Sequence, residues 1–89
     1  MKEERIEIGN KLGLHARAAA KLVHTASQFD ADITIGNEEE EVNAKSILGL
    51  LTLAATKGTH VRVRASGRDE EQAVRAVVEL IKDRFGEPE

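Results

Sequence analysis

Cysteine, tryptophan and tyrosine are absent from this 89-residue sequence, and Phe29 and Phe85 are its only aromatic residues. Without cysteine the chain has neither disulfides nor thiolate metal ligands, which fits a reducing compartment. Two phenylalanines offer little for the base stacking that single-stranded nucleic-acid binders use. A formal net charge of −3 also disfavours binding to a phosphate backbone. We therefore expect no nucleic-acid partner.

Long hydrophobic runs are lacking as well. No stretch approaches the roughly twenty apolar residues of a membrane-spanning helix. The opening Met1–Glu4 leads straight into a strand pattern, without the apolar segment typical of a secretory signal. These features predict a cytoplasmic protein with no membrane insertion. The length, the 40% hydrophobic content and the mixed charges predict one small domain, residues 1–89, and a monomer.

The spacing of apolar residues predicts an α+β fold in the order βαββαβα. The expected strands cover 5–8, 31–35, a short segment through Val42 and Ala44, and 60–66; the expected helices cover 16–28, 47–53 and a segment after Asp69 with the apolar stripe Ala73, Val74, Val77, Leu80, Ile81 and Phe85. A four-stranded antiparallel sheet with three helices on one face buries these surfaces economically. The pattern leaves the adjacency of the strands open, and a ferredoxin-like arrangement also satisfies it.

The most informative segment, Asn10–Arg17, places His15 at the start of the first expected helix. Gly13 marks the turn that precedes it. The backbone N–H groups of a first helical turn are unpaired and attract anions, and the side chain of Arg17 adds a positive charge. Neutral imidazole is a nucleophile near neutral pH, since its reference pKa is about 6.5. We expect the backbone N–H groups of Ala16, Arg17 and Ala18 to hold a phosphoryl group carried by His15.

A second informative segment surrounds the short helix 47–53. Ser46 is a good N-cap for this helix and needs no further role to explain its presence. The helix carries more leucine and isoleucine than one buried stripe requires. We expect an exposed patch that docks partner proteins, with a basic rim suited to acidic surfaces. The expected patch residues are Leu14, Ile47, Leu48 and Leu51, and the expected rim is Arg17, Lys21 and Lys45.

Metal binding is not expected. His24 lies nine positions after His15, on the other side of the helix, so the two side chains cannot share a metal. His60 begins a strand and is expected to face solvent. The sequence contains no metal-ligand spacing, no glycine-rich phosphate loop and no serine–histidine–aspartate arrangement, so we expect no metal and no cofactor.

Several motifs together resemble those of the histidine-containing phosphocarrier (HPr) family of bacterial phosphotransferase systems. They are Gly13–Arg17, Ala19-Ala20, Lys45–Leu48, Lys57-Gly58 and Ala65–Gly67, while Asn10–His15 is also similar to the nitrogen-related NPr branch. The resemblance implies an open-faced β-sandwich and a phosphocarrier rather than an enzyme. It implies that Enzyme I, charged by phosphoenolpyruvate, phosphorylates Nδ1 of His15, which passes the group to IIA proteins or domains. It does not specify the sugar or nitrogen pathway.

The resemblance also implies regulatory phosphorylation of Ser46 by HPr kinase/phosphorylase, in bacteria that have this enzyme. Two positions differ from the usual family pattern. Ala18 replaces a proline, and we expect its N–H to add a donor near the phosphoryl group. Leu12 replaces a polar residue, which leaves the helix cap to His15 or the backbone. Two alternative functions remain: an interaction module controlled at Ser46, and a small anion-binding regulatory domain.

Overall fold

The computed structural model describes residues 1–89 and contains a four-stranded antiparallel sheet with three α-helices. The elements are β1 (Lys2–Glu7), α1 (Ala16–Ala26), β2 (Asp32–Gly36), β3 (Glu41–Asn43), α2 (Ile47–Leu53), β4 (His60–Ser66), α3 (Glu70–Lys82) and the 3-10 turn η1 (Arg84–Gly86). The strand order is β1-β4-β2-β3, and each neighbouring pair is antiparallel. The predicted fold class is confirmed, and the strand adjacency that the pattern left open is now defined.

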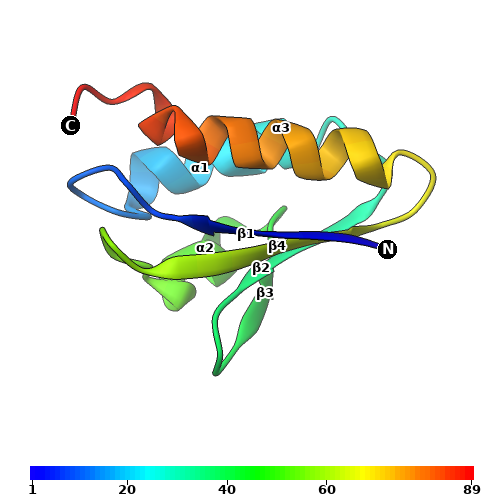
Figure 1. Ribbon diagram of the computed structural model, residues 1–89, viewed down its shortest axis with the longest axis horizontal. Coiled ribbons are helices and arrows are strands. Elements are labelled where there is room, and N and C mark those ends of the chain that lie inside the picture. Colours follow the sequence, from blue (N-terminus) through cyan, green and yellow to red (C-terminus); the bar gives the residue numbers. More distant parts are fainter.

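Helices α1 and α3 form a layer over one face of the sheet, and α2 packs against α1 and β3 (Figure 1). Strand β4 illustrates how the core is built, because Val61, Val63 and Ala65 are buried while His60 and Ser66 are exposed. This alternation follows from the pleat of a strand that is covered on one side only. In total, 23 apolar residues are buried in one cluster.

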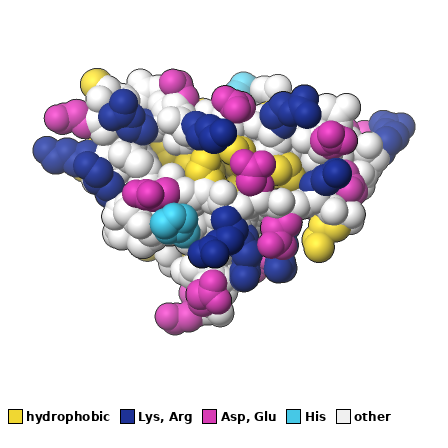
Figure 2. Space-filling model, viewed as in Figure 1, with side chains coloured by type: hydrophobic (Ala, Val, Ile, Leu, Met, Phe, Trp, Pro, Cys, Tyr) yellow, Lys and Arg dark blue, Asp and Glu magenta, His cyan; other side chains and the backbone are white.

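Positive and negative side chains are interspersed over the face seen in Figure 2, around an apolar band. Oppositely charged side chains also pair across strands: Arg64 Nε on β4 lies 2.6 Å from Glu3 Oε1 on β1. Such exposed pairs contribute little to stability. None of the helices combines the length and apolar character that crossing a bilayer requires.

The boundaries of four elements differ from those predicted, and β2 is shifted by one residue to Asp32–Gly36. Strand β1 begins at Lys2 because it pairs with β4 over its whole length, although its first four residues are charged and exposed. Helix α1 ends at Ala26, where Ser27 is the C-cap. Strand β3 covers only Glu41–Asn43, so Ala44 is buried just after the strand ends.

The apolar stripe predicted for α3 is buried at Ala73, Val74, Val77 and Ile81. Leu80 packs partly buried against the core, and Val78, which was not predicted, is buried as well. Phe85 is fully buried, but it lies beyond the helix, in η1. The chain turns there through the left-handed region at Arg84 and Phe85, a conformation that is unfavourable for residues other than glycine. Helical periodicity therefore does not describe how Phe85 reaches the core.

Asp69 precedes α3 as predicted but makes no side-chain capping hydrogen bond to that helix. Its carboxylate instead accepts the backbone N–H groups of Asp30 at 3.0 Å and Ala31 at 2.9 Å. Asp69 therefore fastens the start of α3 to the segment that enters β2. The Asp30 hydrogen bond is the main reason that the pKa of the Asp69 carboxyl lies below its ordinary value.

Candidate phosphoryl-accepting site

The loop before α1 is held in shape by Asn10 and Gly13. The side-chain amide of Asn10, which is fully buried, donates to the Gly13 carbonyl at 2.8 Å. Gly13 has a φ of +64°, and a Cβ at this position would lie 2.5 Å from the Ala55 carbonyl oxygen. The next residue, Leu14, donates its N–H to that same oxygen at 2.8 Å. These contacts fix the point at which the chain enters the helix.

His15 is the N-cap of α1, which is one of the two possibilities that Leu12 at the usual polar position left open. Its Nδ1 accepts the backbone N–H of Arg17 at 3.3 Å, and its carbonyl accepts the first helical N–H, from Ala19, at 2.8 Å. No protein acceptor binds the N–H groups of Ala16 and Ala18. The His15 side chain is 25% exposed. The ring is accessible, and unpaired helical N–H groups lie beside it.

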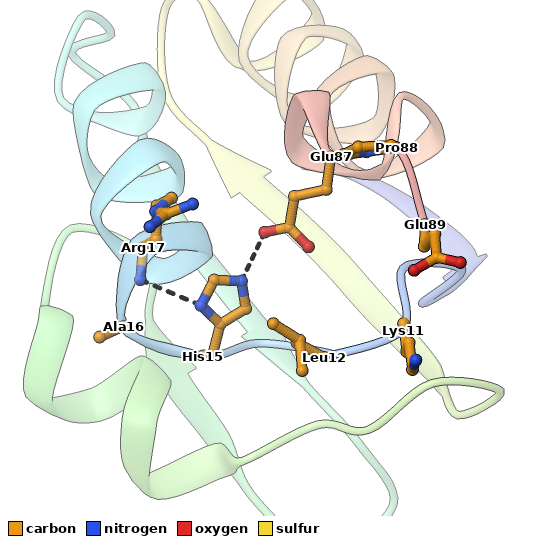
Figure 3. A pocket seen from close by; sticks show the side chains of 8 residues that line it. All are labelled: Lys11, Leu12, His15, Ala16, Arg17, Glu87, Pro88 and Glu89. Atoms are coloured by element: carbon orange, nitrogen blue, oxygen red, sulfur yellow. Dashed lines mark hydrogen bonds and ion pairs between the residues drawn. The ribbon is translucent and has the colours of Figure 1, made fainter.

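An open depression surrounds the His15 ring (Figure 3). It is lined by Lys11, Leu12, His15, Ala16, Arg17, Glu87, Pro88 and Glu89. The guanidinium of Arg17 has no hydrogen-bond or ion-pair partner within the protein. The depression therefore combines an uncommitted cation, the free backbone N–H of Ala16 and a partly exposed imidazole, which together suit a phosphate group.

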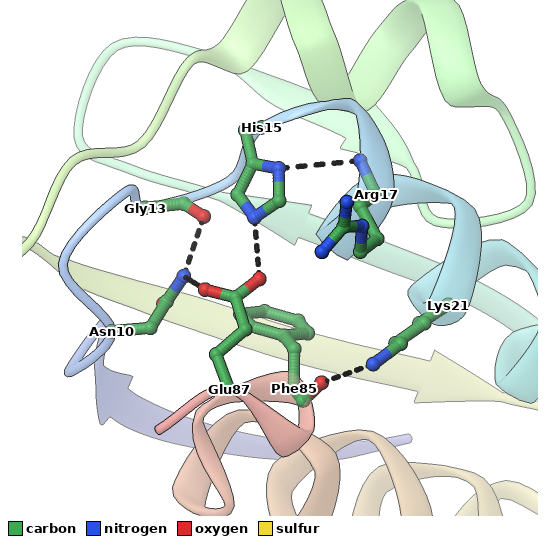
Figure 4. A network of polar contacts seen from close by, with 7 residues as sticks. All are labelled: Asn10, Gly13, His15, Arg17, Lys21, Phe85 and Glu87. Carbon is green, nitrogen blue, oxygen red and sulfur yellow. Dashed lines mark hydrogen bonds and ion pairs between the residues drawn. The ribbon is translucent and has the colours of Figure 1, made fainter. Parts of the chain in front are cut away.

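Glu87 is a hydrogen-bonding partner of the His15 ring that the sequence did not predict. Its carboxylate contacts Nε2 of His15, and its second oxygen accepts the side-chain amide of Asn10 at 3.0 Å (Figure 4). Burial opposes ionisation of this carboxyl, but the hydrogen bonds from His15 and Asn10 outweigh burial and hold its pKa below the ordinary value. Seventy-two positions separate Glu87 from His15, and no local motif links them.

Two predicted rim lysines are partly engaged by backbone carbonyls. Lys21 Nζ donates to the Phe85 carbonyl at 2.7 Å, and Lys45 Nζ donates to the Phe29 carbonyl at 2.7 Å. Lys21 is exposed, whereas Lys45 is half-buried. Both ammonium groups therefore also hold neighbouring segments in place.

The predicted apolar patch is exposed at three of its four positions. Ile47, Leu48 and Leu51 are 43%, 76% and 39% exposed. The inclusion of Leu14 is wrong, because this side chain is only 3% exposed and belongs to the core. The buried turn at Gly13 directs Leu14 inward immediately before His15. We call Ile47, Leu48 and Leu51 the α2 patch.

Ser46 has the capping role that was predicted for it. Its Oγ accepts the backbone N–H of Gly49 at 3.1 Å, and the residue is half-buried. His24 and His60 are both exposed and lie outside the depression. No three histidine, cysteine, aspartate or glutamate side chains are grouped closely enough to hold a metal ion.

Comparisons with known proteins match the chain over all or most of its length. A family model described as the PTS HPr component phosphorylation site matches residues 2–83. The phosphocarrier protein HPr of Xylella fastidiosa (strain Temecula1) is 52% identical over 87 residues, 98% of each chain. The phosphocarrier protein NPr of Shewanella violacea is 45% identical over 85 residues, 96% of this chain and 93% of the relative. The crystal structure of HPr-C-His from Thermoanaerobacter tengcongensis is 49% identical, covers 100% of both chains and has a TM-score of 0.96.

Proposed function

Because the chain belongs to the HPr family of phosphotransferase-system phosphocarriers, we propose that it accepts a phosphoryl group on His15 from Enzyme I. It then passes this group to IIA proteins or domains. The chain is a phosphocarrier and not an enzyme. The relay operates in the cytoplasm with the protein as a monomer, which fits the absence of cysteine and the mixed surface charge.

The observation that supports this proposal best is the setting of the His15 ring. The ring is partly exposed at the N-terminus of α1, and its Nδ1 faces the backbone N–H of Arg17. A phosphoryl group on Nδ1 would lie where the helix presents its unpaired N–H groups and the positive end of its dipole. The depression around the ring is open, so a partner protein can reach a phosphoryl group held there and accept it.

Arg17 and Ala18 supply further stabilisation in this proposal. The uncommitted guanidinium of Arg17 lines the depression and can form charge-assisted hydrogen bonds with phosphoryl oxygens. The N–H of Ala18 has no acceptor in the protein. Although Ala18 is buried, in this proposal its N–H donates to the phosphoryl group together with that of Ala16 and with that of Arg17, which is released when Nδ1 is phosphorylated.

Partner proteins dock on the α2 patch in this proposal. The patch is apolar and exposed on a helix that packs against α1, the helix that begins at His15. Exposed apolar side chains near a reactive group are suited to transient docking. Arg17 and Lys21 are exposed and basic, while the half-buried Lys45 contributes less surface. Both Enzyme I and the IIA acceptors would bind to this surface, which is formed by the α2 patch and the neighbouring basic residues.

Ser46 is the proposed site of regulation. Its hydroxyl caps α2, and a phosphate there would place two negative charges beside the α2 patch. Phosphorylation would slow docking of an acidic partner without moving the backbone. The test is phosphorylation by HPr kinase/phosphorylase, followed by measurement of the Enzyme I rate. An unmodified Ser46, or an unchanged rate after modification, would contradict this role.

The relay itself is tested by incubating the protein with phosphoenolpyruvate and Enzyme I and measuring its intact mass. We expect one acid-labile phosphoryl group, mapped to His15, that is lost on addition of a IIA protein. The variant His15→Ala should gain no mass under the same conditions. An unmodified wild-type protein would instead favour an anion-binding domain or an interaction module.

A further inference from the structure

The C-terminal segment lies beside the loop that precedes α1, and it holds Glu87 firmly over the His15 ring (Figures 1 and 4). On one side of Glu87, Phe85 is fully buried and its carbonyl accepts Lys21 Nζ at 2.7 Å. On the other side, the Glu89 carbonyl accepts the backbone N–H of Lys11 at 2.8 Å. The Glu87 side chain is only 12% exposed. The contact between Glu87 and the ring is therefore held in place by the packing and hydrogen bonds of the residues on both sides of Glu87.

The hydrogen bonds of the His15 ring define which nitrogen carries the proton. A neutral imidazole has one N–H donor and one lone-pair acceptor. Nδ1 faces the N–H of Arg17 and must be the acceptor, whereas Nε2 faces the carboxylate of Glu87 and must be the donor. Asn10 donates to the other carboxylate oxygen, so both oxygens of Glu87 act as acceptors. The network is consistent only when the proton is on Nε2.

Given the proposed phosphoryl transfer to His15, we propose that Glu87 is a positioning residue that keeps the proton on Nε2 and thereby leaves Nδ1 as the nucleophile. The lone pair of Nδ1 leaves the Arg17 N–H and forms the N–P bond, while the bond between phosphorus and the donor's leaving group breaks and that group keeps the electron pair. The ring then carries the phosphoryl group on Nδ1 and the proton on Nε2, and it is a cation. The carboxylate of Glu87 stabilises this cation across the existing hydrogen bond.

Discharge of the carrier reverses these steps. The acceptor attacks phosphorus, the electrons of the N–P bond return to Nδ1, and the ring leaves as a neutral imidazole that still has its proton on Nε2. No proton has to move in either direction. A carboxylate that orients a nucleophilic or basic histidine in this way has the same logic as the aspartate of a serine–histidine–aspartate triad.

Other charged groups also face the ring, and none of them substitutes for Glu87. Lys11, Arg17 and Glu89 line the depression, and Lys21 approaches the same segment through the Phe85 carbonyl. Of these side chains, none makes a hydrogen bond or ion pair with the imidazole. Glu87 alone contacts Nε2.

The variant Glu87→Gln tests this inference sharply. Asn10 donates a hydrogen bond to residue 87, and in the glutamine variant only the amide oxygen can accept it. The amide NH2 would then face Nε2 of His15, and a donor in that position requires a lone pair on Nε2. We expect the proton to shift toward Nδ1, which 15N NMR of the unphosphorylated protein measures directly. We expect a loss of about tenfold or more in the transfer rate from phosphorylated Enzyme I, by comparison with other histidine-orienting carboxylates. Glu87→Leu should give a mixture of tautomers, and Glu38→Gln, which alters an exposed glutamate between β2 and β3 and outside the depression, should change neither measurement.

Wild-type tautomer ratios in both Glu87 variants would overturn the inference, as would a wild-type transfer rate in Glu87→Gln. The NMR measurement needs no phosphoryl donor and also reports whether each variant is folded. It therefore separates the inference from the proposed function: a wild-type protein that gains no phosphoryl group refutes the relay while the tautomer result stands.

Discussion

The side-chain amide of Asn10 donates a hydrogen bond to Glu87 at 3.0 Å and so joins two parts of the chain that are 77 positions apart. The same amide group donates to the Gly13 carbonyl at 2.8 Å. One fully buried asparagine thus holds both the loop that carries His15 and the tail that contacts its ring. These two hydrogen bonds fix the position of the loop relative to the tail, and so the geometry of the candidate site.

Replacing Asn10 by alanine should therefore destabilise the protein. The variant leaves the Gly13 carbonyl without its buried partner and frees one oxygen of Glu87, which should cost about 1–3 kcal/mol in the free energy of unfolding. Urea denaturation measures this cost. The control is Asn43→Ala, which removes an exposed side chain with one hydrogen bond, to the Lys45 N–H. An equal effect of the two substitutions would argue against a special role for Asn10.

Leu14 and Leu12 allow a matched comparison within one loop. Leu14 is 3% exposed and Leu12 is 68% exposed. Leu14→Ala should lower the free energy of unfolding by about 2–5 kcal/mol, because it leaves a cavity in the core. Leu12→Ala should change it by less than about 0.5 kcal/mol. If thermal or urea denaturation found the two variants equally stable, Leu14 would not be the core residue that the structure describes.

The sequence was sufficient to predict the fold and the local part of the site. Apolar periodicity is strong where a strand or helix is covered on one side, as in β4, and there the prediction holds. The junction between β1 and α1 could also be predicted from the sequence, because Gly13, His15 and Arg17 each have a local role within a few residues. The place of His15 at the start of α1 follows from that segment alone.

The contribution of the C-terminal tail could not be predicted, because it depends on contacts between residues far apart in the sequence. Phe85 reaches the core through a left-handed turn at Arg84 and Phe85, which no helical period describes. That turn directs Glu87 back toward His15. The burial of Leu14 was missed for a related reason: the turn at Gly13 depends on the Ala55 carbonyl, which is distant in the sequence.

The α2 patch gives a prediction about docking. Leu48 is its most exposed member, at 76%, so Leu48→Glu should leave the fold intact while placing a charge on the contact surface. We expect the kcat/KM of Enzyme I for this protein to fall about tenfold or more, which corresponds to about 1.4 kcal/mol. Gln72→Glu adds the same charge on α3 and should have little effect. A normal kcat/KM with Leu48→Glu would remove the patch from the proposed interface.

Asp69 gives a prediction about pH. Its folded-state pKa is lowered, chiefly by the hydrogen bond from the Asp30 N–H, so its contribution to stability is present above the unfolded pKa of about 4. That contribution is lost as pH falls through the folded pKa. Asp69→Asn should therefore have a lower urea midpoint than wild type at pH 7, and the gap should narrow by pH 3. A gap of the same size at both pH values would contradict this.

The control for that measurement is Asp32→Asn, which alters an exposed carboxylate at the start of β2. Its urea midpoint should follow that of the wild-type protein at both pH values. This comparison separates the effect of the Asp69 hydrogen bonds from the general effect of removing one negative charge.

Ala18 distinguishes this chain from the usual family pattern, and its N–H is unpaired in the structure. Ala18→Pro removes that N–H from the first turn of α1, where proline is compatible with a helix. The fold should therefore persist, while the phosphohistidine at His15 should have a shorter half-life because one donor to its oxygens is lost. Ala18→Gly keeps the N–H and should preserve the half-life. If the proline variant retained both the wild-type half-life and the wild-type transfer rate, the N–H of Ala18 would have no part in holding the phosphoryl group, and Arg17 with its own N–H would suffice.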